Sequence, residues 1–230
     1  MKTIGMLGGM SWESSIEYYR IINETIKERL GGLHSAQSLM YSVDFSEIEK
    51  LQNAGDWEAL TRVMIDAAKC LEQGGAELLV ICTNTMHRMA PEVSEAINIP
   101  LLHIADATAD AIKAKHLQTV GLLGTRFTME GEFYRGKLEK EHGLKVLIPD
   151  EAGCDIVHRI IYDELVQGVI REASRKAYLD VIADLETRGA EGVILGCTEI
   201  PLLVKQKEVP LPIFDTTTIH AQSAVDWALM

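Results

Sequence analysis

The sequence predicts an α/β fold of two similar lobes, each with a mostly parallel sheet flanked by helices, and three observations lead to this fold class. Continuous apolar runs such as Leu78-Leu79-Val80-Ile81 are typical of strands that helices cover on both faces of a sheet. These runs alternate along the chain with segments of helical spacing. The chain of 230 residues also repeats itself at a nearly constant offset, which indicates an internal duplication.

The duplication rests on two matches that occur in the same order in both halves. Segment 72–85 resembles segment 186–199 at an offset of 114 residues, and segment 3–8 resembles segment 119–124 at an offset of 116. In both pairs an apolar run ends at a glycine or at a small polar triplet. Common α/β patterning explains either match alone, but the two together predict duplicated halves near 1–100 and 101–210.

The expected elements follow from the apolar patterns in chain order. A strand at 2–7 leads into helical spacing from Trp12 to Leu30, which Gly31-Gly32 ends. Further strands are expected at 36–43, 77–82, 118–123, 144–148, 192–196 and 211–214, and further helices at 60–71, 125–141, 152–166, 171–188 and 216–229. The last helix would return to the first lobe. The expected domains are therefore 1–100 plus 211–230 and 101–210, with Pro100 and Pro210 near the crossovers.

Charge and cysteine content narrow the classes of function. The chain has 22 Lys and Arg against 34 Asp and Glu, a net charge of −12, and no basic run, so we expect no nucleic acid and no membrane partner. Its four cysteines lack the spacing of a metal site or a disulfide framework, which favours reduced thiols and no metal. Trp12-Glu13-Ser14 interrupts the apolar start before a signal core develops, and no apolar run reaches membrane-spanning length. We expect a cytoplasmic protein.

The polar motifs fall where such sheets bind ligands, beyond the carboxyl ends of the strands. Four motifs are expected to meet at one sheet edge: Gly8-Gly9-Met10-Ser11, Thr83-Asn84-Thr85, Gly124-Thr125 and Cys197-Thr198-Glu199. A duplicated fold would bring the two polar triplets together, with one group on each face of a small ligand.

Cys197 is the strongest candidate for a reactive group. It follows an apolar strand and precedes a helix start, whose free N–H groups would lower the pKa of the thiol and favour thiolate. A buried structural cysteine is the alternative at a strand end. Glu199 could orient Cys197 or bind a substrate amine, although an acid in a first helical turn is also ordinary.

Thr83 occupies the matching position in the first half, and its hydroxyl is a poor base. It can hold a water, bind a carboxylate or donate a proton weakly. Asn84 and Thr85 suit a substrate carboxylate or amine, with helix capping as the alternative. His87 lies one helical turn beyond Thr83, where capping or packing explains it as well as catalysis does. Cys82 should point the other way and pack in the core.

These motifs resemble the aspartate/glutamate racemase family over essentially the whole chain. The resemblance is carried by Gly8-Gly9-Met10, Thr83-Asn84-Thr85 and Gly196-Cys197-Thr198-Glu199. It implies an enzyme without a cofactor, two similar α/β lobes with the active site in the cleft between them, an amino-acid substrate and a homodimer. In the family pattern two cysteines face the α-carbon, one removing a proton while the other supplies one.

The sequence departs from this pattern because Thr83 stands in place of the first cysteine. The resemblance then implies that Cys197 deprotonates the L-enantiomer and that Thr83, or a water it holds, reprotonates the opposite face. We expect faster turnover from L to D than from D to L. The expected substrate contacts are Met10, Ser11, Gln52, Asn84, Thr85, Thr125, Thr198 and Glu199.

Side-chain specificity is open at this point. Gln52 and Glu164 lie where family members that use aspartate hold its second carboxylate with basic residues, and neither is cationic. Arg126 is one cationic candidate. Aspartate or glutamate is the first expectation, with a broader neutral range close behind. A one-cysteine decarboxylase or isomerase of the same superfamily and a non-catalytic amino-acid-binding protein are the further alternatives.

Overall fold

The structure is a computed structural model that describes residues 1–230, and the chain divides into two compact units. The first unit contains residues 1–104 and 220–230, and the second contains residues 105–219. The chain therefore passes between the units twice, after Ile104 and after Ile219.

A four-stranded parallel sheet forms the centre of the first unit, in the order β2-β1-β3-β4. Its strands are β1 (Ile4–Gly8), β2 (Ser38–Ser42), β3 (Leu78–Ile81) and β4 (Leu101–Leu102). Ile4 is in register with Ser38 on one side and with Leu78 on the other. Because all four strands run the same way, their carboxyl ends share one edge of the sheet.

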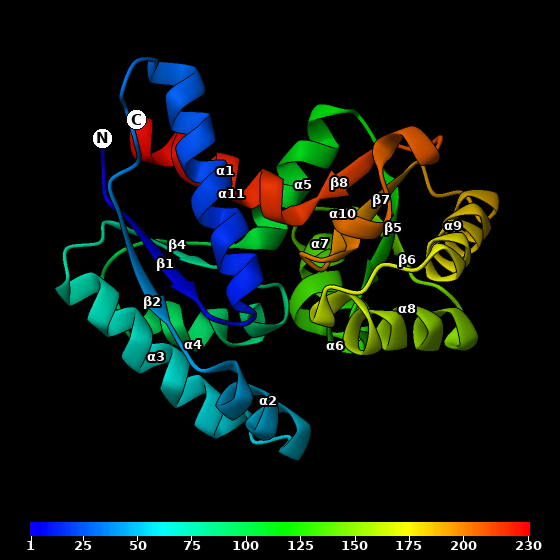
Figure 1. The fold of residues 1–230 in the computed structure, drawn as a ribbon, viewed down its shortest axis with the longest axis horizontal. Coiled ribbons are helices and arrows are strands. Elements are labelled where there is room, and N and C mark those ends of the chain that lie inside the picture. The colour runs from blue at the N-terminus through cyan, green and yellow to red at the C-terminus, as the bar shows by residue number, and fades with distance from the viewer. The chain divides into compact units, whose positions relative to one another are not determined.

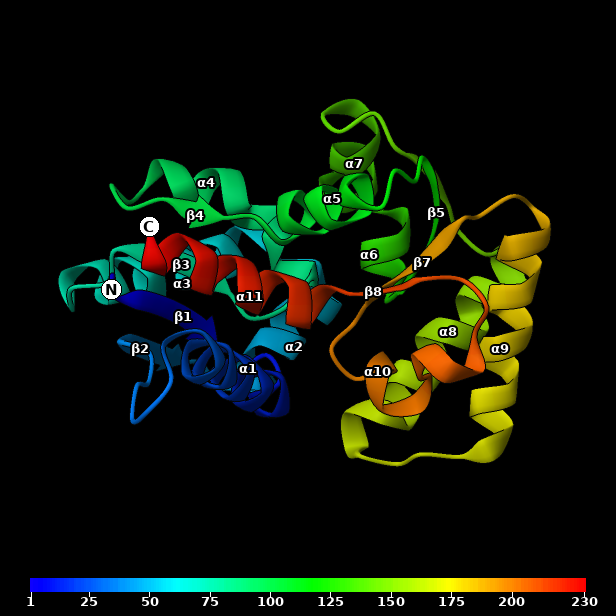
Figure 2. The same cartoon turned by 90° about the horizontal axis from the view of Figure 1, so that it is seen from above.

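Helices cover both faces of this sheet. On one face α1 (Trp12–Leu30) and α11 (Thr216–Leu229) lie side by side and are joined by an Arg29–Asp226 ion pair (Figure 1, Figure 2). On the other face lie α2 (Phe45–Ala54), α3 (Trp57–Gln73), the 3-10 turn η1 (Thr85–Met89) and α4 (Ala90–Glu95). Helices α1, α2 and α3 each begin at an N-cap residue whose side chain accepts a hydrogen bond from a main-chain N–H. These N-cap residues are Ser11, Asp44 and Asp56.

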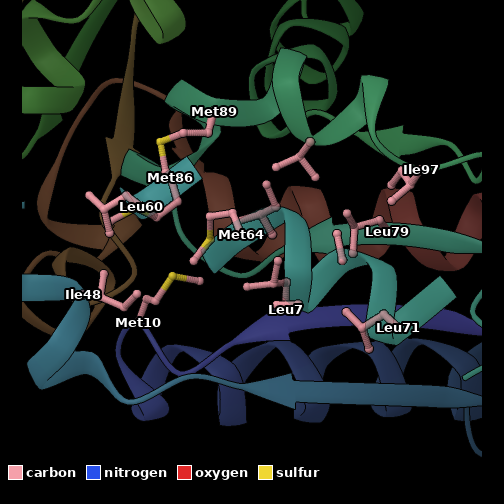
Figure 3. Close-up of a cluster of buried hydrophobic side chains, with 14 of the residues drawn as sticks. Leu7, Met10, Ile48, Leu60, Met64, Leu71, Leu79, Met86, Met89 and Ile97 are labelled. Atoms are coloured by element: carbon pink, nitrogen blue, oxygen red, sulfur yellow. The ribbon is translucent and has the colours of Figure 1, made fainter. Parts of the chain in front are cut away.

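Each face of the sheet buries its own apolar cluster because successive strand residues point to opposite faces. Met6 and Val80 pack with the helices α1 and α11, whereas Leu7 and Ile81 pack with α3 and α4. The cluster that contains Leu7 and Ile81 is rich in methionine (Figure 3). Its buried methionines are Met10, Met64, Met86 and Met89. Met10, at the end of β1, thus belongs to the core.

The second unit repeats the same sheet, in the order β6-β5-β7-β8. Its strands are β5 (Thr119–Gly124), β6 (Lys145–Leu147), β7 (Gly192–Gly196) and β8 (Ile213–Asp215), all parallel. The two four-stranded parallel sheets have the same strand order, and helices flank both. This architecture confirms the predicted fold class.

The helices of the second unit are shorter and more often interrupted. They are α5 (Ile104–Ala114), α6 (Arg126–Glu130), η2 (Glu132–Gly136), α7 (Lys137–Lys140), α8 (Glu151–Asp163), η3 (Leu165–Gln167), α9 (Glu172–Thr187), α10 (Ile200–Leu203) and η4 (Gln206–Glu208). The long helices α8 and α9 lie side by side, where Tyr178 donates its hydroxyl hydrogen to the carbonyl of Val157 (Figure 2).

Several predicted elements need correction. The single helix expected at 125–141 is three shorter pieces. Gly131 takes extended backbone (φ −75°, ψ 128°) and ends α6, and η2 and α7 then follow each other directly. The helices α2, α4, α5 and α10 and the two-residue strand β4 were not predicted from the sequence. The other predicted strands are present within one or two residues of their expected ends. No helix combines the length and the hydropathy that crossing a bilayer requires.

Candidate functional site

In the first unit the carboxyl ends of β1 and β3 bring two of the predicted motifs to one edge. Gly9 has φ of +93°, and a Cβ there would lie 2.3 Å from the carbonyl oxygen of Val43, so only glycine fits this turn. The main-chain N–H of Gly9 donates to Ser15 Oγ at 2.7 Å. Ser11 begins α1 and is buried, 6% exposed.

The second motif at this edge, Thr83-Asn84-Thr85, follows β3. Two successive main-chain carbonyls at the end of this strand form hydrogen bonds with side chains. Ser14 Oγ donates to the carbonyl of Cys82 at 2.6 Å, and His87 Nδ1 is 2.8 Å from the carbonyl of Thr83. Thr83 is partly exposed, whereas Asn84 and Thr85 are buried. Asn84 is the N-cap residue of η1, yet its side chain makes no capping hydrogen bond, so capping does not explain its presence.

Two histidines near this edge, His87 and His220, are fully buried and neutral. Burial, together with the neighbouring rings of His103 and His220, holds the pKa of His87 well below its usual value. Burial also lowers the pKa of His220 from 6.5 to about 4. His220 Nε2 lies 2.9 Å from the carbonyl of Leu102 and its Nδ1 lies 2.8 Å from Tyr18 Oη. Since a carbonyl only accepts, Nε2 carries the hydrogen and Tyr18 donates to Nδ1.

In the second unit Cys197 and Glu199 form a hydrogen-bonded pair directly after β7. Cys197 Sγ donates to Glu199 Oε2 at 2.9 Å, and the Thr198 hydroxyl donates to the same oxygen at 2.7 Å. Glu199 is 7% exposed, while the Cys197 side chain keeps partial access to solvent. A carboxylate that receives two donors is held in one orientation beside the thiol.

The expectation that Cys197 has a lowered pKa and is a thiolate at rest is wrong. Desolvation by the surrounding protein, then the charge and the hydrogen bond of Glu199, raise the pKa of the thiol well above its usual value. The main-chain N–H groups of Glu199 and Thr198 lower it, as predicted, but they are the smaller effect. The helix that follows, α10, has only four residues, so its dipole is small. Cys197 therefore rests as a thiol whose proton points at Glu199.

Other predicted residues have local structural partners. Thr125 begins α6 by accepting the Thr128 N–H. Arg126, the cationic candidate, is already paired with Asp155 and Glu130, each at 2.5 Å. Glu164, at the end of α8, accepts the Ser174 hydroxyl at 2.6 Å. No unengaged cation is thus present among the residues expected to bind a substrate side chain.

Two predicted contacts lie in the interior of the first unit. Met10 packs with Ile48 and Met64 in the methionine-rich cluster, so its side chain is part of the core (Figure 3). Gln52 is 5% exposed on α2, one turn beyond Ile48. Cys82 is fully buried in the core, as expected, and burial raises its pKa.

The predicted meeting of four motifs at one edge is replaced by two pairs, one on each sheet. The first sheet carries the motifs that contain Gly9 and Thr83, and the second carries Thr125 and Cys197. The sequence reading missed Ser14 and His220, whose partners lie 68 and 118 residues away along the chain. The chain has no group of three or more His, Cys, Asp or Glu side chains placed to hold a metal ion.

Comparison with known proteins gives one family over nearly the whole chain. Residues 7–224 match the family model described as Asp/Glu/hydantoin racemase. The crystal structure of a Yersinia pestis protein, provisionally described as an Asp/Glu racemase, is 54% identical with a TM-score of 0.95, and the match covers 100% of both chains. An aspartate racemase homologue from Pyrococcus horikoshii OT3 is 36% identical with a TM-score of 0.88, again over 100% of both chains.

Curated relatives are more distant. A glutamate racemase from Persephonella marina is 28% identical over 148 residues, which is 64% of this chain and 55% of that protein. The match thus spans about half the length of that relative. The broad specificity amino-acid racemase RacX from Bacillus subtilis is 23% identical over 74% of this chain and 73% of its own length.

Proposed function

Since the chain belongs to the Asp/Glu/hydantoin racemase family, we propose that it is an amino-acid racemase that inverts aspartate or glutamate by moving the α-proton, without a cofactor. The observation that carries this proposal is the Cys197–Glu199 hydrogen bond at the carboxyl end of β7. It gives a partly exposed thiol a built-in proton acceptor, the buried carboxyl group of Glu199.

In the proposed reaction Cys197 acts first. Its proton passes to Glu199 Oε2, and the thiolate that remains is stabilised by the main-chain N–H groups of Thr198 and Glu199. The thiolate then takes the α-proton of the L-enantiomer, so that the S–H bond re-forms while the electron pair stays on the substrate as a carbanion. A buried thiol with a raised pKa is a strong base once its own proton has been moved.

Thr83 is the proposed partner on the other face of the α-carbon. Its hydroxyl, or a water it holds, donates a proton to the carbanion and completes the D-enantiomer. Glu199 then releases to solvent the proton that it took from Cys197, and the Thr83 side regains one from solvent. The partial exposure of Thr83 supports this role, because a used hydroxyl must regain its proton from solvent. The proposal requires one substrate to reach both Cys197 and Thr83.

A broader substrate range is the second candidate, and one observation favours it. The residues expected at the substrate side chain offer no unengaged cation, because Arg126 is tied to Asp155 and Glu130 while Gln52 is neutral. A second carboxylate on the substrate would have to be held by neutral donors. The Bacillus subtilis relative described as a broad specificity racemase is consistent with this alternative.

The test is a panel of L- and D-amino acids incubated with the protein in D₂O. Racemisation predicts exchange of the α-hydrogen with inversion. A decarboxylase would release CO₂, and a binding protein would be stabilised thermally by a ligand without exchange. Cys197→Ala should abolish turnover, whereas Cys154→Ala, at another largely buried cysteine of the same unit, should not. Full activity of Cys197→Ala would refute the mechanism.

We also propose a homodimer, as the family resemblance implies. Trp12, Ile16 and Tyr19 lie on one stripe of α1 and are 61%, 51% and 53% exposed. Contiguous large apolar side chains of this kind are often protein contacts. Sedimentation of the wild-type chain should give twice the monomer mass, and a monomer at all concentrations would refute the proposal.

A further inference from the structure

The main chain at Thr83 is fixed from both sides by buried side chains. Ser14 Oγ holds the carbonyl of Cys82, and His87 Nδ1 holds the next carbonyl, that of Thr83. Ser14 is 2% exposed and His87 is fully buried, so water does not compete for either bond. The peptide group on each side of Thr83 therefore has one defined orientation.

The second ring nitrogen of His87 decides which nitrogen carries the hydrogen. The main-chain N–H of Ile104 donates to His87 Nε2 at 3.2 Å, so Nε2 must be the bare nitrogen. Nδ1 then carries the hydrogen and donates to the Thr83 carbonyl at 2.8 Å. His87 is fully buried, and desolvation disfavours a positive charge on its ring. His87 thus stays neutral, with its one hydrogen directed at Thr83.

We infer that His87 is a positioning residue for Thr83, which fixes the peptide group of Thr83 so that its hydroxyl, or the water it holds, is aligned for the protonation step. The inference rests on the proposed function. It assigns His87 no contact with the substrate, because its two ring nitrogens are occupied by Thr83 and Ile104.

A threonine needs such support more than a cysteine would. Its hydroxyl is a weak acid, so proton donation depends strongly on distance and direction. A displacement of about 1 Å at a reacting group can lower the rate by roughly 10²-fold. Loss of the His87 contact should therefore slow protonation by Thr83 while leaving proton removal by Cys197 nearly intact.

Two substitutions separate the two bonds of His87. In His87→Asn the amide nitrogen takes the place of Nδ1 and can still donate to the Thr83 carbonyl. In His87→Gln the amide lies near the former Nε2, so it can accept from Ile104 but loses the bond to Thr83. His220→Gln is the matched control, since it alters another fully buried neutral histidine that does not contact Thr83.

The readout is the fate of an L-substrate in D₂O. Deuterated L-substrate reports removal of the α-proton by Cys197, exchange of the thiol proton with D₂O and return of deuterium to the same face. D-product reports protonation from the Thr83 side. We expect His87→Gln to lower the ratio of inversion to exchange with retention by about tenfold or more. His87→Asn and His220→Gln should keep the wild-type ratio, whatever their stability.

The outcomes are distinguishable. A wild-type chain that neither exchanges nor inverts any amino acid would overturn the proposed function and the inference with it. Wild-type activity combined with an unchanged ratio in His87→Gln would overturn the inference alone. If His87→Gln does not fold, His87→Asn decides: a wild-type ratio supports the inference and a lowered ratio refutes it.

Discussion

Lowering the pH should destabilise the first unit through His220, which the fold keeps buried and neutral. Its pKa is about 4 in the folded chain against 6.5 for a free imidazole. A group whose folded pKa is lowered stabilises the fold above the unfolded pKa, and this contribution is lost as the pH falls through the folded pKa. The window of loss for His220 is therefore between about pH 6.5 and pH 4.

The magnitude follows from the two pKa values. A difference of one pKa unit between the folded and unfolded states corresponds to about 1.36 kcal/mol. The free energy of unfolding should therefore fall by about 2 kcal/mol between pH 7 and pH 5. His220→Gln does not titrate and retains an amide near the Leu102 carbonyl, so it serves as the reference. Protonation of His87 and of the carboxyl groups occurs in both proteins and largely cancels in their difference.

The assay is urea unfolding of both proteins at pH 7, 6 and 5. The wild-type chain should be the more stable at pH 7, and its advantage over His220→Gln should shrink by about 2 kcal/mol at pH 5. An advantage that does not change with pH would show that His220 is not held neutral by burial. An advantage that grows in acid would reverse the sign and refute the reasoning.

Two further predictions concern the reactive groups. Thr83→Cys supplies a stronger acid and base on the Thr83 side and should raise kcat for the D-enantiomer by roughly tenfold or more, with a smaller change for the L-enantiomer; equal changes in chiral assays would count against the assignment. Glu199→Gln removes the charge that helps to raise the pKa of Cys197, so alkylation of Cys197, followed by mass spectrometry of its peptide, should begin at lower pH. An unchanged or upward-shifted alkylation profile would contradict the role of Glu199.

The repeat along the sequence was enough to predict the two sheets and to place the polar motifs after strand ends, but not to divide the motifs between the two sheets. Apolar runs such as 192–196 are buried strands, and the motifs at Thr83 and Cys197 follow strand ends in both units. These features depend on local pattern, which the sequence carries directly. The missed helix α2 had a local signal too, with Asp44 before its first turn and Gly55 after its last.

The pKa values at the site and the contacts between distant segments could not be predicted from local sequence pattern. The raised pKa of Cys197 depends on desolvation, which distant segments supply, and a helix start alone suggested the opposite sign. His220 and Leu102 meet only after the fold has formed, because 118 residues separate them. The break at Gly131 is a similar case, since Gly131 adopts extended backbone that interrupts an otherwise helical pattern.

The most direct test of the central claim, that Cys197 and Thr83 are unequal partners, is kinetics from both enantiomers with the wild-type chain. The equilibrium constant between enantiomers is one, so kcat/KM must be equal in the two directions and the asymmetry can appear only in kcat and KM taken separately. The account predicts a higher kcat from L to D than from D to L, with a matching difference in KM. Equal kcat and equal KM from both enantiomers would contradict it.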